Sequence, residues 1–457
     1  MLWRHLHPLN VRLHPREIAG IAKHAADRFL LVDDVLLPVL DKFLESAPFE
    51  RIIVAPYGGG NIPGSLLNYE ELLAGASDDF CYPAMDENDG AELCYTSGTT
   101  GDPKGVLYSH RALVLHSLAE LAADSFAVSH YDTVLPLAPM FHANAWGLPF
   151  TCAMAGARLI LPGPNLDAES ILELIVHERV TMACGVPTIW FAVLDALEKD
   201  PDRWKFSWPI RIVCGGAATP ERLLRGMEKH GLSAFQAWGM TETTPLATLG
   251  QLKSHMRQWP KDAQYEVRTK QGWPTPFVEA RVMQELDGKP MEAPCDGTAR
   301  GELEVRGPWV AGSYYGAPDQ AHRWSEDGWF RTGDMATIDE DGFIKIVDRA
   351  KDMVKSGGEW ISSVDIENAL MSHPGVKETA VIGLPHPKWQ ERPLAAVVLK
   401  DGAAATADEL RNFLAQSFAK WQIPDAFVFL EAIPRASVGK FKKTTLREQF
   451  ADWKWEQ

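Results

Sequence analysis

The sequence predicts an α/β protein: a large N-terminal domain of parallel α/β sheets plus a small β unit, followed by a small, mobile α+β domain. The first observation is that short apolar runs alternate with amphipathic stretches through the first half of the chain, which is typical of parallel sheets covered by helices. The second is that short alternating runs separated by Gly and Asp follow Gln264, which indicates a mainly antiparallel β unit. A chain of 457 residues is long enough for about three domain-sized units.

The N-terminal half contains the elements expected of parallel sheets. From Pro15 onwards, apolar residues recur at the spacing of one helical face, so we expect a helix to begin there. The apolar runs that we expect to form strands are residues 29–32, 51–54, 92–95, 158–161, 181–184 and 210–214. The amphipathic stretches that we expect to form helices include residues 169–179 and 220–230.

The second half contains the β unit and then a separate small domain. Residues 301–305 and 342–347 alternate between apolar and polar side chains, which predicts strands of the β unit. We place the domain boundary at about residue 349, which divides the chain into residues 1–348 and 349–457. Residues 351–457 contain as many acidic as basic side chains, so the net charge of −16 lies in the residues before them. In the small domain we expect helices at 364–371 and 408–418 and strands at 379–382, 395–399 and 426–430.

Composition excludes several classes of protein. A net charge of −16 argues against a general binder of nucleic acid or anionic membranes, which needs a basic surface. The 6 cysteines are widely spaced without a CxxC pair, which favours a reducing, cytoplasmic location. The first residues lack the apolar core of a signal peptide, and the most apolar long stretch, residues 148–162, is interrupted by Arg158. We therefore expect no transmembrane segment.

The strongest chemical motif is the loop from Tyr95 to Gly105. Its glycines leave the backbone free to wrap an anion, its hydroxyls can donate hydrogen bonds, and Lys104 adds a positive charge, so it is a candidate polyphosphate cradle. The glycine spacing differs from that of a Walker A loop. An ordinary turn after a strand is the competing interpretation. The residues expected to bind phosphate are Thr96, Ser97, Gly98, Thr99, Thr100, Gly101 and Lys104.

With this loop and the motifs that follow it in order, the chain resembles the adenylate-forming enzymes and, among them, the acyl-CoA synthetases. The resemblance extends from near the N-terminus to about Lys443. The segment 215–218 resembles the run that lines the family's adenine pocket, although small residues there could also serve close packing. The segment 236–243 resembles the signature that places an aromatic ring on adenine, a threonine on the α-phosphate and a glutamate on Mg²⁺. On Trp238 alone, a core aromatic residue is the alternative.

The resemblance also assigns ribose, hinge and lysine motifs. Asp334 in the segment 329–334 would accept hydrogen bonds from both ribose hydroxyls. Arg349 would reach the nucleotide, and Lys351 stands where the family has its hinge. Lys440 matches the family's adenylation lysine, whereas we interpret Lys442 and Lys443 as surface charges. The nucleotide set outside the glycine-rich loop is then Gly216, Ala217, Ala218, Gln236, Ala237, Trp238, Thr241, Asp334, Arg349, Lys351 and Trp360, with Thr96 and Glu242 as the metal ligands.

The segment 139–147 resembles the family's acid-binding motif. Relatives that activate amino acids typically carry Asp where this chain has His142, and a buried ammonium group without a counter-charge would be costly. An amino acid substrate is therefore disfavoured. His142 and Trp146, spaced as His-x-x-x-Trp, look like the residues of medium- and long-chain fatty acyl-CoA synthetases in which the tryptophan gates the acyl tunnel. Core packing is the alternative for both.

The implied reaction has two steps, which require two domain arrangements. The carboxylate of a small-molecule acid attacks MgATP to give acyl-AMP and pyrophosphate, and coenzyme A, a co-substrate, then takes the acyl group. The small domain would rotate about Lys351, withdraw Lys440 and bring Gly357 and Gly358 to the coenzyme A tunnel. The residues expected to act in catalysis are Lys440, Thr241, Glu242, Lys104, Lys351 and Lys355.

The chain departs from the family at its N-terminus, because the region that resembles it begins within the large domain. A sheet without its usual neighbours would expose an edge or an apolar face and favour self-association, so a homodimer is possible. Two alternatives to an active fatty acyl-CoA synthetase stay open. One is a truncated relative that binds ATP with little or no turnover, and the other is a CoA ligase for a short thioether or aromatic acid.

Overall fold

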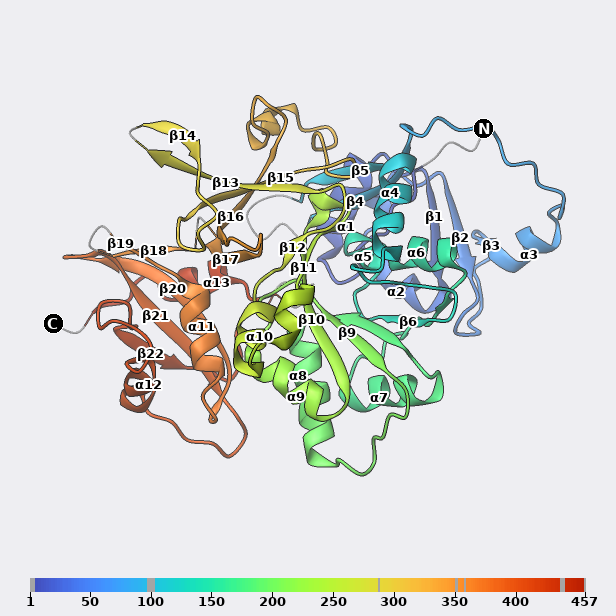
Figure 1. The fold of residues 1–457 in the computed structure, drawn as a ribbon. Helices are drawn as coiled ribbons and strands as arrows, with labels where there is room; N and C mark the ends of the chain where they lie inside the picture. Colours follow the sequence, from blue (N-terminus) through green and yellow to red (C-terminus); the bar gives the residue numbers. More distant parts are fainter. Residues whose placement is uncertain are drawn as a thin grey trace.

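The computed structural model describes residues 5–96, 103–286, 288–349, 352–356, 359–435 and 440–455. In Figure 1 the chain forms a large body, coloured blue to yellow, with a smaller orange and red part beside it. The described ends of the chain lie on opposite sides of the molecule (Figure 1). The predicted α/β fold class, with a small domain after a large one, is confirmed by this arrangement.

A seven-stranded sheet forms the centre of the large body. Its strands lie in the order β12 (Trp273–Pro274), β11 (Leu246–Leu249), β10 (Leu232–Gly239), β9 (Ile210–Cys214), β8 (Met182–Gly185), β6 (Thr133–Pro136), β7 (Arg158–Leu159). The strands from β10 to β7 are parallel, whereas β11 and β12 are antiparallel additions. This confirms the three strands predicted between residues 158 and 214.

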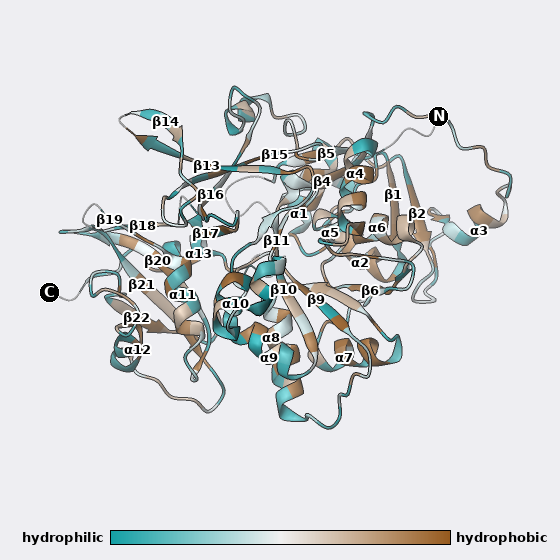
Figure 2. Ribbon diagram, viewed as in Figure 1, coloured by the Kyte–Doolittle hydropathy of each residue, from teal (hydrophilic) through white to brown (hydrophobic). Residues whose placement is uncertain are grey.

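Helices cover both faces of this sheet because successive strand residues alternate between two cores. Side chains of α7 (Ala168–His177), α8 (Pro187–Lys199), α9 (Glu221–Lys229) and α10 (Lys261–Arg268) bury one face. Residues of α6 (Leu148–Ala155) and of the segment that follows α4 (His110–Leu121) pack on the other. Figure 2 shows the central strands as largely apolar and the outer sides of the helices as polar.

Residues 29–109 contribute two smaller sheets. One sheet consists of three parallel strands, β1 (Phe29–Asp33), β2 (Arg51–Ala55) and β3 (Leu67–Asn68). The helices of this part of the chain are α1 (Pro15–His24), α2 (Leu37–Leu40) and α3 (Tyr69–Ala74). α1 begins at Pro15 as predicted, because His14 and Glu17 cap its first turn reciprocally. The side chains of Phe29 and Leu31 are exposed on β1.

One predicted strand was assigned to the wrong kind of sheet. Residues 92–95 do lie in a strand, β4 (Gly90–Tyr95), but it pairs antiparallel with β5 (Gly105–Ser109) in a two-stranded ribbon. The physical reason is the short connection between them, since a parallel pair needs a crossover of a dozen or more residues. The glycine-rich segment therefore connects two antiparallel strands.

The β unit is an antiparallel sheet, as predicted. It contains β14 (Lys289–Glu292), β13 (Glu279–Leu286), β15 (Gly301–Arg306), β16 (Phe330–Ile338) and β17 (Ile344–Arg349) in that order. It begins later than Gln264, the predicted start. The intervening residues complete α10 and then add β12 to the central sheet.

The small domain consists of a sheet and two layers of helix. Its strands lie in the order β19 (Glu359–Ile361), β18 (Val354–Ser356), β21 (Gln390–Leu399), β20 (Val376–His386), and β22 (Ala426–Phe429) pairs parallel with β21. α11 (Ser363–Met371) and α12 (Ala407–Leu414) contribute to one core, and α13 (Lys443–Gln449) to a second. These elements confirm the predicted α+β pattern, while the boundary at about residue 349, the hinge and the mobility stay predictions.

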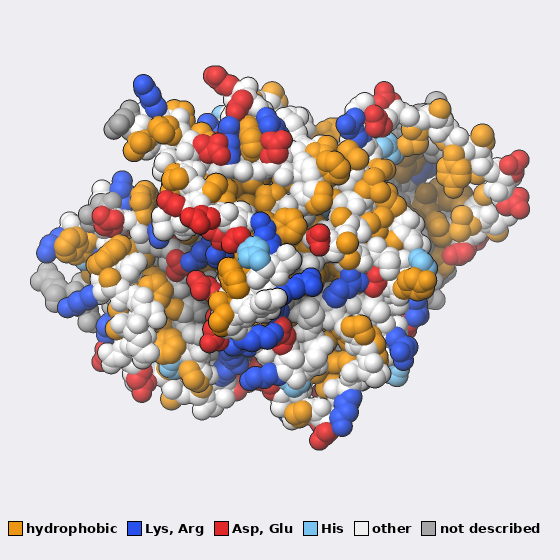
Figure 3. All heavy atoms as spheres, in the orientation of Figure 1, with side chains coloured by type: hydrophobic (Ala, Val, Ile, Leu, Met, Phe, Trp, Pro, Cys, Tyr) orange, Lys and Arg blue, Asp and Glu red, His pale blue; other side chains and the backbone are white. Residues whose placement is uncertain are grey.

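The surface carries charges of both signs. Figure 3 shows acidic and basic side chains interspersed over one face of the molecule. Within the described ranges, the helices are too short or too polar to cross a membrane.

Candidate active site

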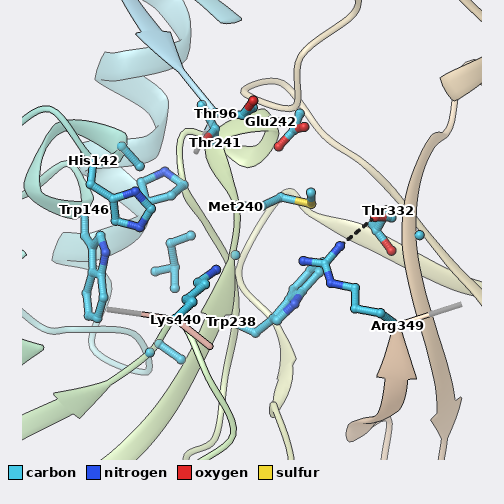
Figure 4. A pocket seen from close by; sticks show the side chains of 18 of the residues that line it. Thr96, His142, Trp146, Trp238, Met240, Thr241, Glu242, Thr332, Arg349 and Lys440 are labelled. Atoms are coloured by element: carbon cyan, nitrogen blue, oxygen red, sulfur yellow. Dashed lines mark hydrogen bonds between the residues drawn. The ribbon is translucent and has the colours of Figure 1, made fainter. Parts of the chain in front are cut away.

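A cavity of about 680 Å³ lies where the hairpin β4–β5, the central sheet, the β unit and the small domain meet. Elements far apart in the sequence contribute to its wall (Figure 4). The predicted site residues that line it are Thr96, Lys104, His142, Trp146, Gly216, Ala237, Trp238, Thr241, Glu242, Arg349 and Lys440. The fold therefore brings the separate motifs of the sequence to one place.

The base of the glycine-rich hairpin is held by two reciprocal hydrogen bonds. The Thr96 amide donates to the Lys104 carbonyl at 2.9 Å, and the Lys104 amide donates to Thr96 Oγ1 at 3.0 Å. The Lys104 ammonium lies 5.3 Å from the centre of the Tyr314 ring. The predicted phosphate ligands Ser97, Gly98, Thr99, Thr100 and Gly101 lie outside the described residues.

Thr241 and Glu242 stand in a tight turn directly after β10. The Tyr108 hydroxyl donates to the Thr241 carbonyl at 2.7 Å, and the Ala311 amide donates to the Glu242 carbonyl at 2.8 Å. The Tyr314 hydroxyl donates to Glu242 Oε1, and burial raises the pKa of Tyr314. Tyr314 was not predicted, because its only signal in the sequence is a pair of tyrosines flanked by glycines.

The donor set around Glu242 suits a magnesium ion that arrives with a nucleotide. Magnesium in such sites is usually held by one or two carboxylates together with substrate phosphates and water. The Glu242 carboxylate and the Thr96 hydroxyl both belong to residues that line the cavity. The part of the chain that the structure describes contains no cluster of three His, Cys, Asp or Glu side chains suited to a metal, and a phosphate-bound magnesium ion does not need one.

Trp238, Asp334 and Arg349 form a connected group beside the cavity. The Trp238 indole N–H donates to Asp334 Oδ2 at 3.2 Å, and Arg349 Nε lies 2.7 Å from Asp334 Oδ1. Arg349 also donates to the Thr332 carbonyl at 3.2 Å, the bond drawn in Figure 4. Asp334 is almost fully buried, and Trp238 and Arg349 each contact one of its carboxyl oxygens.

Lys440 enters the cavity from the small domain. In Figure 4 its side chain lies between His142 and Trp146 on one side and Trp238 on the other. Burial, helped by the charge of Arg349, lowers the pKa of Lys440 to about 8, although Asp334 and Glu242 oppose this shift. A cation at this position is close to both the expected acyl end and the expected phosphate end of the cavity.

The acyl end is built on an unusual turn. Positive φ angles run from Ala143 to Gly147 through α5 (Ala143–Trp146), including 57° at Asn144 and 63° at Trp146, so this short element is left-handed and strained. The turn places Trp146 against Gly215, where an added Cβ would lie 3.0 Å from the ring. Burial lowers the pKa of His142 to about 3, so the imidazole is neutral.

Some predicted residues lie outside the wall of the cavity. Gln236 is buried and holds the turn after Gly216 in place. Its Nε2 donates to the Ala217 carbonyl at 3.1 Å, and its Oε1 accepts from the Thr219 amide at 2.7 Å. Ala217 and Ala218 are not among the lining residues. Gln236 thus supports the Gly216 segment from behind.

Lys355, expected to act in catalysis, and Trp360, expected near the nucleotide, lie on the small domain, apart from the cavity. Lys355 and Trp360 face each other across β18 and β19, with the Lys355 ammonium 5.2 Å from the centre of the indole. Neither lines the cavity in this arrangement. Lys351, Gly357 and Gly358 lie outside the described residues. The roles of all five stay predictions.

The interpretation of Lys443 as a surface charge was wrong. Its side chain is only 12% exposed, and its ammonium lies 2.7 Å from Glu367 Oε1 and 2.6 Å from Ser363 Oγ. The reason is that α13 begins at Lys443 and its first turn meets α11. Lys442, in contrast, is exposed as predicted.

Comparison with known proteins identifies the family. The family model described as AMP-binding enzyme matches residues 5–315. The family model described as AMP-binding enzyme C-terminal domain matches residues 365–440. The chain is 48% identical over 451 residues to a long-chain-fatty-acid–CoA ligase of Thermus thermophilus, covering 98% of this chain and 81% of that protein. It is 44% identical over 454 residues to a 3-methylmercaptopropionyl-CoA ligase of Ruegeria lacuscaerulensis, covering 98% and 82%. It is 42% identical over 452 residues to a medium-chain-fatty-acid–CoA ligase of Ectopseudomonas oleovorans, covering 98% and 81%.

Solved structures give the same result. ATP-bound MatB from Rhodopseudomonas palustris superimposes with a TM-score of 0.82 at 28% identity, covering 98% of this chain and 84% of that one. o-Succinylbenzoate coenzyme A synthetase from Bacillus subtilis, in complex with ATP and magnesium ion, gives a TM-score of 0.78 at 26% identity, covering 96% and 83%. The resemblance found in the sequence is thus confirmed, and the chain belongs to the AMP-binding enzyme family.

Proposed function

We propose that this chain is an AMP-forming acid–thiol ligase that converts a medium- or long-chain fatty acid to its coenzyme A thioester. One observation carries the proposal: Lys440 lines one cavity together with His142 and Trp146, the proposed acyl residues, and with the proposed phosphate residues Lys104, Thr241 and Glu242. Two of the relatives, at 48% and 42% identity, bear the names of long- and medium-chain fatty acid ligases, which supports this choice of acid.

In the first step a carboxylate oxygen of the acid forms a bond to the α-phosphorus of ATP while the bond from that phosphorus to the bridging oxygen breaks. The products are acyl-AMP and pyrophosphate. Phosphoryl and nucleotidyl transfer depend mainly on positioning and charge stabilisation. Lys440 would face the negative charge shared by the carboxylate and the α-phosphate, and the Thr241 hydroxyl would donate to an α-phosphate oxygen.

The resemblance to the family supports the remaining nucleotide contacts, for which Glu242, Thr96 and Trp238 line the cavity and Asp334 lies beside it. Glu242 and Thr96 would hold the Mg²⁺ that, when bound, neutralises phosphate charge. Asp334 would take the ribose hydroxyls, and Trp238 the face of the adenine. The neutral imidazole of His142 offers no counter-charge to an ammonium group, which disfavours amino acids.

In the second step the coenzyme A thiolate attacks the acyl carbonyl carbon, and AMP leaves. Lys440 belongs to the small domain, so a rotation about Lys351 would withdraw it after adenylation. Lys355, Trp360 and the Gly357–Gly358 segment would then approach the acyl-AMP. This division of labour between two domain arrangements accounts for the distance of Lys355 and Trp360 from the cavity.

The test is a coupled assay of pyrophosphate release with linear acids from C4 to C16, followed by thioester formation on addition of coenzyme A. We expect pyrophosphate release to require the acid, with a maximum among the medium or long chains. ATP binding without acid-dependent pyrophosphate release would instead identify an ATP-binding relative without turnover.

A second candidate is a ligase for a short thioether acid. It is favoured by the relative named as a 3-methylmercaptopropionyl-CoA ligase, which is 44% identical. Adding 3-methylmercaptopropionate to the same panel separates the two, because a higher kcat/KM for it than for any fatty acid would support the second candidate.

The setting of the enzyme is also a proposal. All 6 cysteines are free, and Cys81 and Cys295 are exposed, which supports a reducing, cytoplasmic location. The exposed apolar side chains of β1 support self-association, and sedimentation analysis of the purified protein would detect a homodimer.

A further inference from the structure

A carboxyl group lies in the wall of the acyl end of the cavity. Glu120, near the end of α4, lines the same cavity as Phe126, Trp146 and Leu246. These three neighbours belong to the apolar core on that face of the central sheet. Glu120 itself is 0% exposed. A polar side chain at this position is unexpected in a pocket for a plain hydrocarbon chain.

Only one of the two carboxyl oxygens of Glu120 has a partner. The Thr151 hydroxyl, on α6, donates to Glu120 Oε2. Glu120 Oε1 is buried and makes no hydrogen bond to any of the residues that the structure describes. His116 Nε2 lies 3.7 Å away, beyond hydrogen-bonding distance, and its lone pair accepts the Leu246 amide at 3.1 Å. The imidazole therefore cannot serve as the missing partner.

Burial favours the neutral form of both the carboxyl group and the imidazole. Burial raises the pKa of Glu120 well above its ordinary value and lowers the pKa of His116 to about 3. A protonated carboxyl group can donate one hydrogen bond and also accept one. With Oε2 occupied by Thr151, the free capacity of the group is at Oε1.

We propose that Glu120 is a specificity-determining residue that selects fatty acids carrying a hydroxyl group on the acyl chain, through a hydrogen bond between that hydroxyl and Oε1. The inference rests on the proposed function, and it narrows the substrate class. A hydroxyl group matches Oε1 whichever oxygen carries the proton, because it both donates and accepts. A methylene group at the same place leaves a buried oxygen unpaired, and sites of this kind discriminate strongly against the analogue that lacks the polar group.

A purely structural role would be a link between α4 and α6. That link uses Oε2 and Thr151 alone, so it predicts that loss of either residue has the same consequence for every acid. A specificity role predicts an effect that depends on the acid and on Oε1. The two roles are therefore separable by comparing substitutions at 120 and 151.

The experiment measures kcat/KM for octanoate and for its monohydroxy isomers, by pyrophosphate release, in the full chain. For the wild type we expect at least one hydroxy isomer to be preferred to octanoate by about tenfold or more. Glu120→Leu should reverse the preference by raising kcat/KM for octanoate and lowering it for that isomer. Glu120→Gln, which stays neutral and polar, should keep the preference, and so should the control Thr151→Val. The KM for ATP should not change in any variant.

Three results would overturn the proposal. They are a wild-type preference for octanoate over every hydroxy isomer, an equal loss for both acids in Glu120→Leu, and a preference for octanoate in Glu120→Gln. The first needs no variant, so the proposal can be rejected even if Glu120→Leu does not fold. Failure of the proposed function is a distinct result, because no acid in the panel would then release pyrophosphate.

Discussion

The indole N–H of Trp238 donates a hydrogen bond to Oδ2 of Asp334 at 3.2 Å. Arg349 holds the other oxygen, Oδ1, at 2.7 Å. The carboxylate proposed to bind ribose is thus fixed by an aromatic residue from the central sheet and a cation from the end of the β unit. In the proposed binding mode Trp238 would have two functions, since its ring face would contact the base while its N–H holds the carboxylate.

Removal of the indole N–H should weaken nucleotide binding more than it slows the chemistry. Trp238→Phe keeps a ring to stack on adenine but loses the bond to Asp334, and hydrogen bonds to charged groups contribute roughly 1.5–3 kcal/mol. We expect the KM for ATP to rise about tenfold with a smaller change in kcat, measured by pyrophosphate release. An unchanged KM would mean that Arg349 alone is sufficient to position Asp334.

Loss of the Lys440 ammonium should separate the two half-reactions. Lys440→Ala removes the cation that lies between the acyl and phosphate ends, and such a preorganised charge contributes about 10²–10³ in rate. Adenylate formation should fall by at least that factor, while thioester formation from supplied acyl-AMP should stay within about twofold of the wild type, as measured by single-turnover assays. An equal loss in both steps would contradict the proposed withdrawal of Lys440.

The sequence predicted the residues of contiguous motifs much better than the residues that support them. Thr241, Glu242 and Lys440 stand in recognisable segments, and the fold brings them to one cavity. Tyr314 was missed because its partner Glu242 lies 72 positions away, and Glu120 because Thr151 is contributed by another helix. No local pattern encodes such pairs.

The errors in the fold have the same origin. The composition of the apolar run 92–95 predicts a buried strand but does not show whether its partner is parallel or antiparallel. The pairing is antiparallel because only a short connection separates this strand from β5. The local sequence around Lys443 indicates a surface charge, because Glu367 comes close to its ammonium group only when α13 packs against α11. α1 and β9 depend mainly on local sequence, and their predicted positions agree closely with the structure.

The pKa of Lys440 predicts a pH limit on the first step. Its pKa is lowered to about 8, so the side chain is charged below this pH and loses its proton above it. We expect kcat/KM for ATP, which reflects the free enzyme, to fall with one proton dissociation above about pH 8. Bound phosphates would favour the charged form, so kcat should fall only at higher pH. The residual activity of Lys440→Arg should not fall in this pH range, because an arginine stays charged. If the activity of this variant still falls above about pH 8, the titrating group is another residue.

The contact between Lys443 and Glu367 predicts a difference between two adjacent lysines. Lys443 Nζ lies 2.7 Å from Glu367 Oε1, and the two side chains are 12% and 9% exposed. Lys443→Met would therefore leave a buried carboxyl group without its counter-charge. Such a loss lowers the free energy of unfolding by about 3–5 kcal/mol in comparable pairs. Lys442→Met is the matched control, because Lys442 is exposed and surface substitutions change stability by about 0.5 kcal/mol or less. Chemical denaturation followed by tryptophan fluorescence should therefore show a lower midpoint for Lys443→Met alone. The double variant Lys443→Met/Glu367→Gln should recover part of the loss, since the unpaired acid is removed. Equal midpoints for the two single variants would show that α13 does not depend on this pair for its attachment to α11.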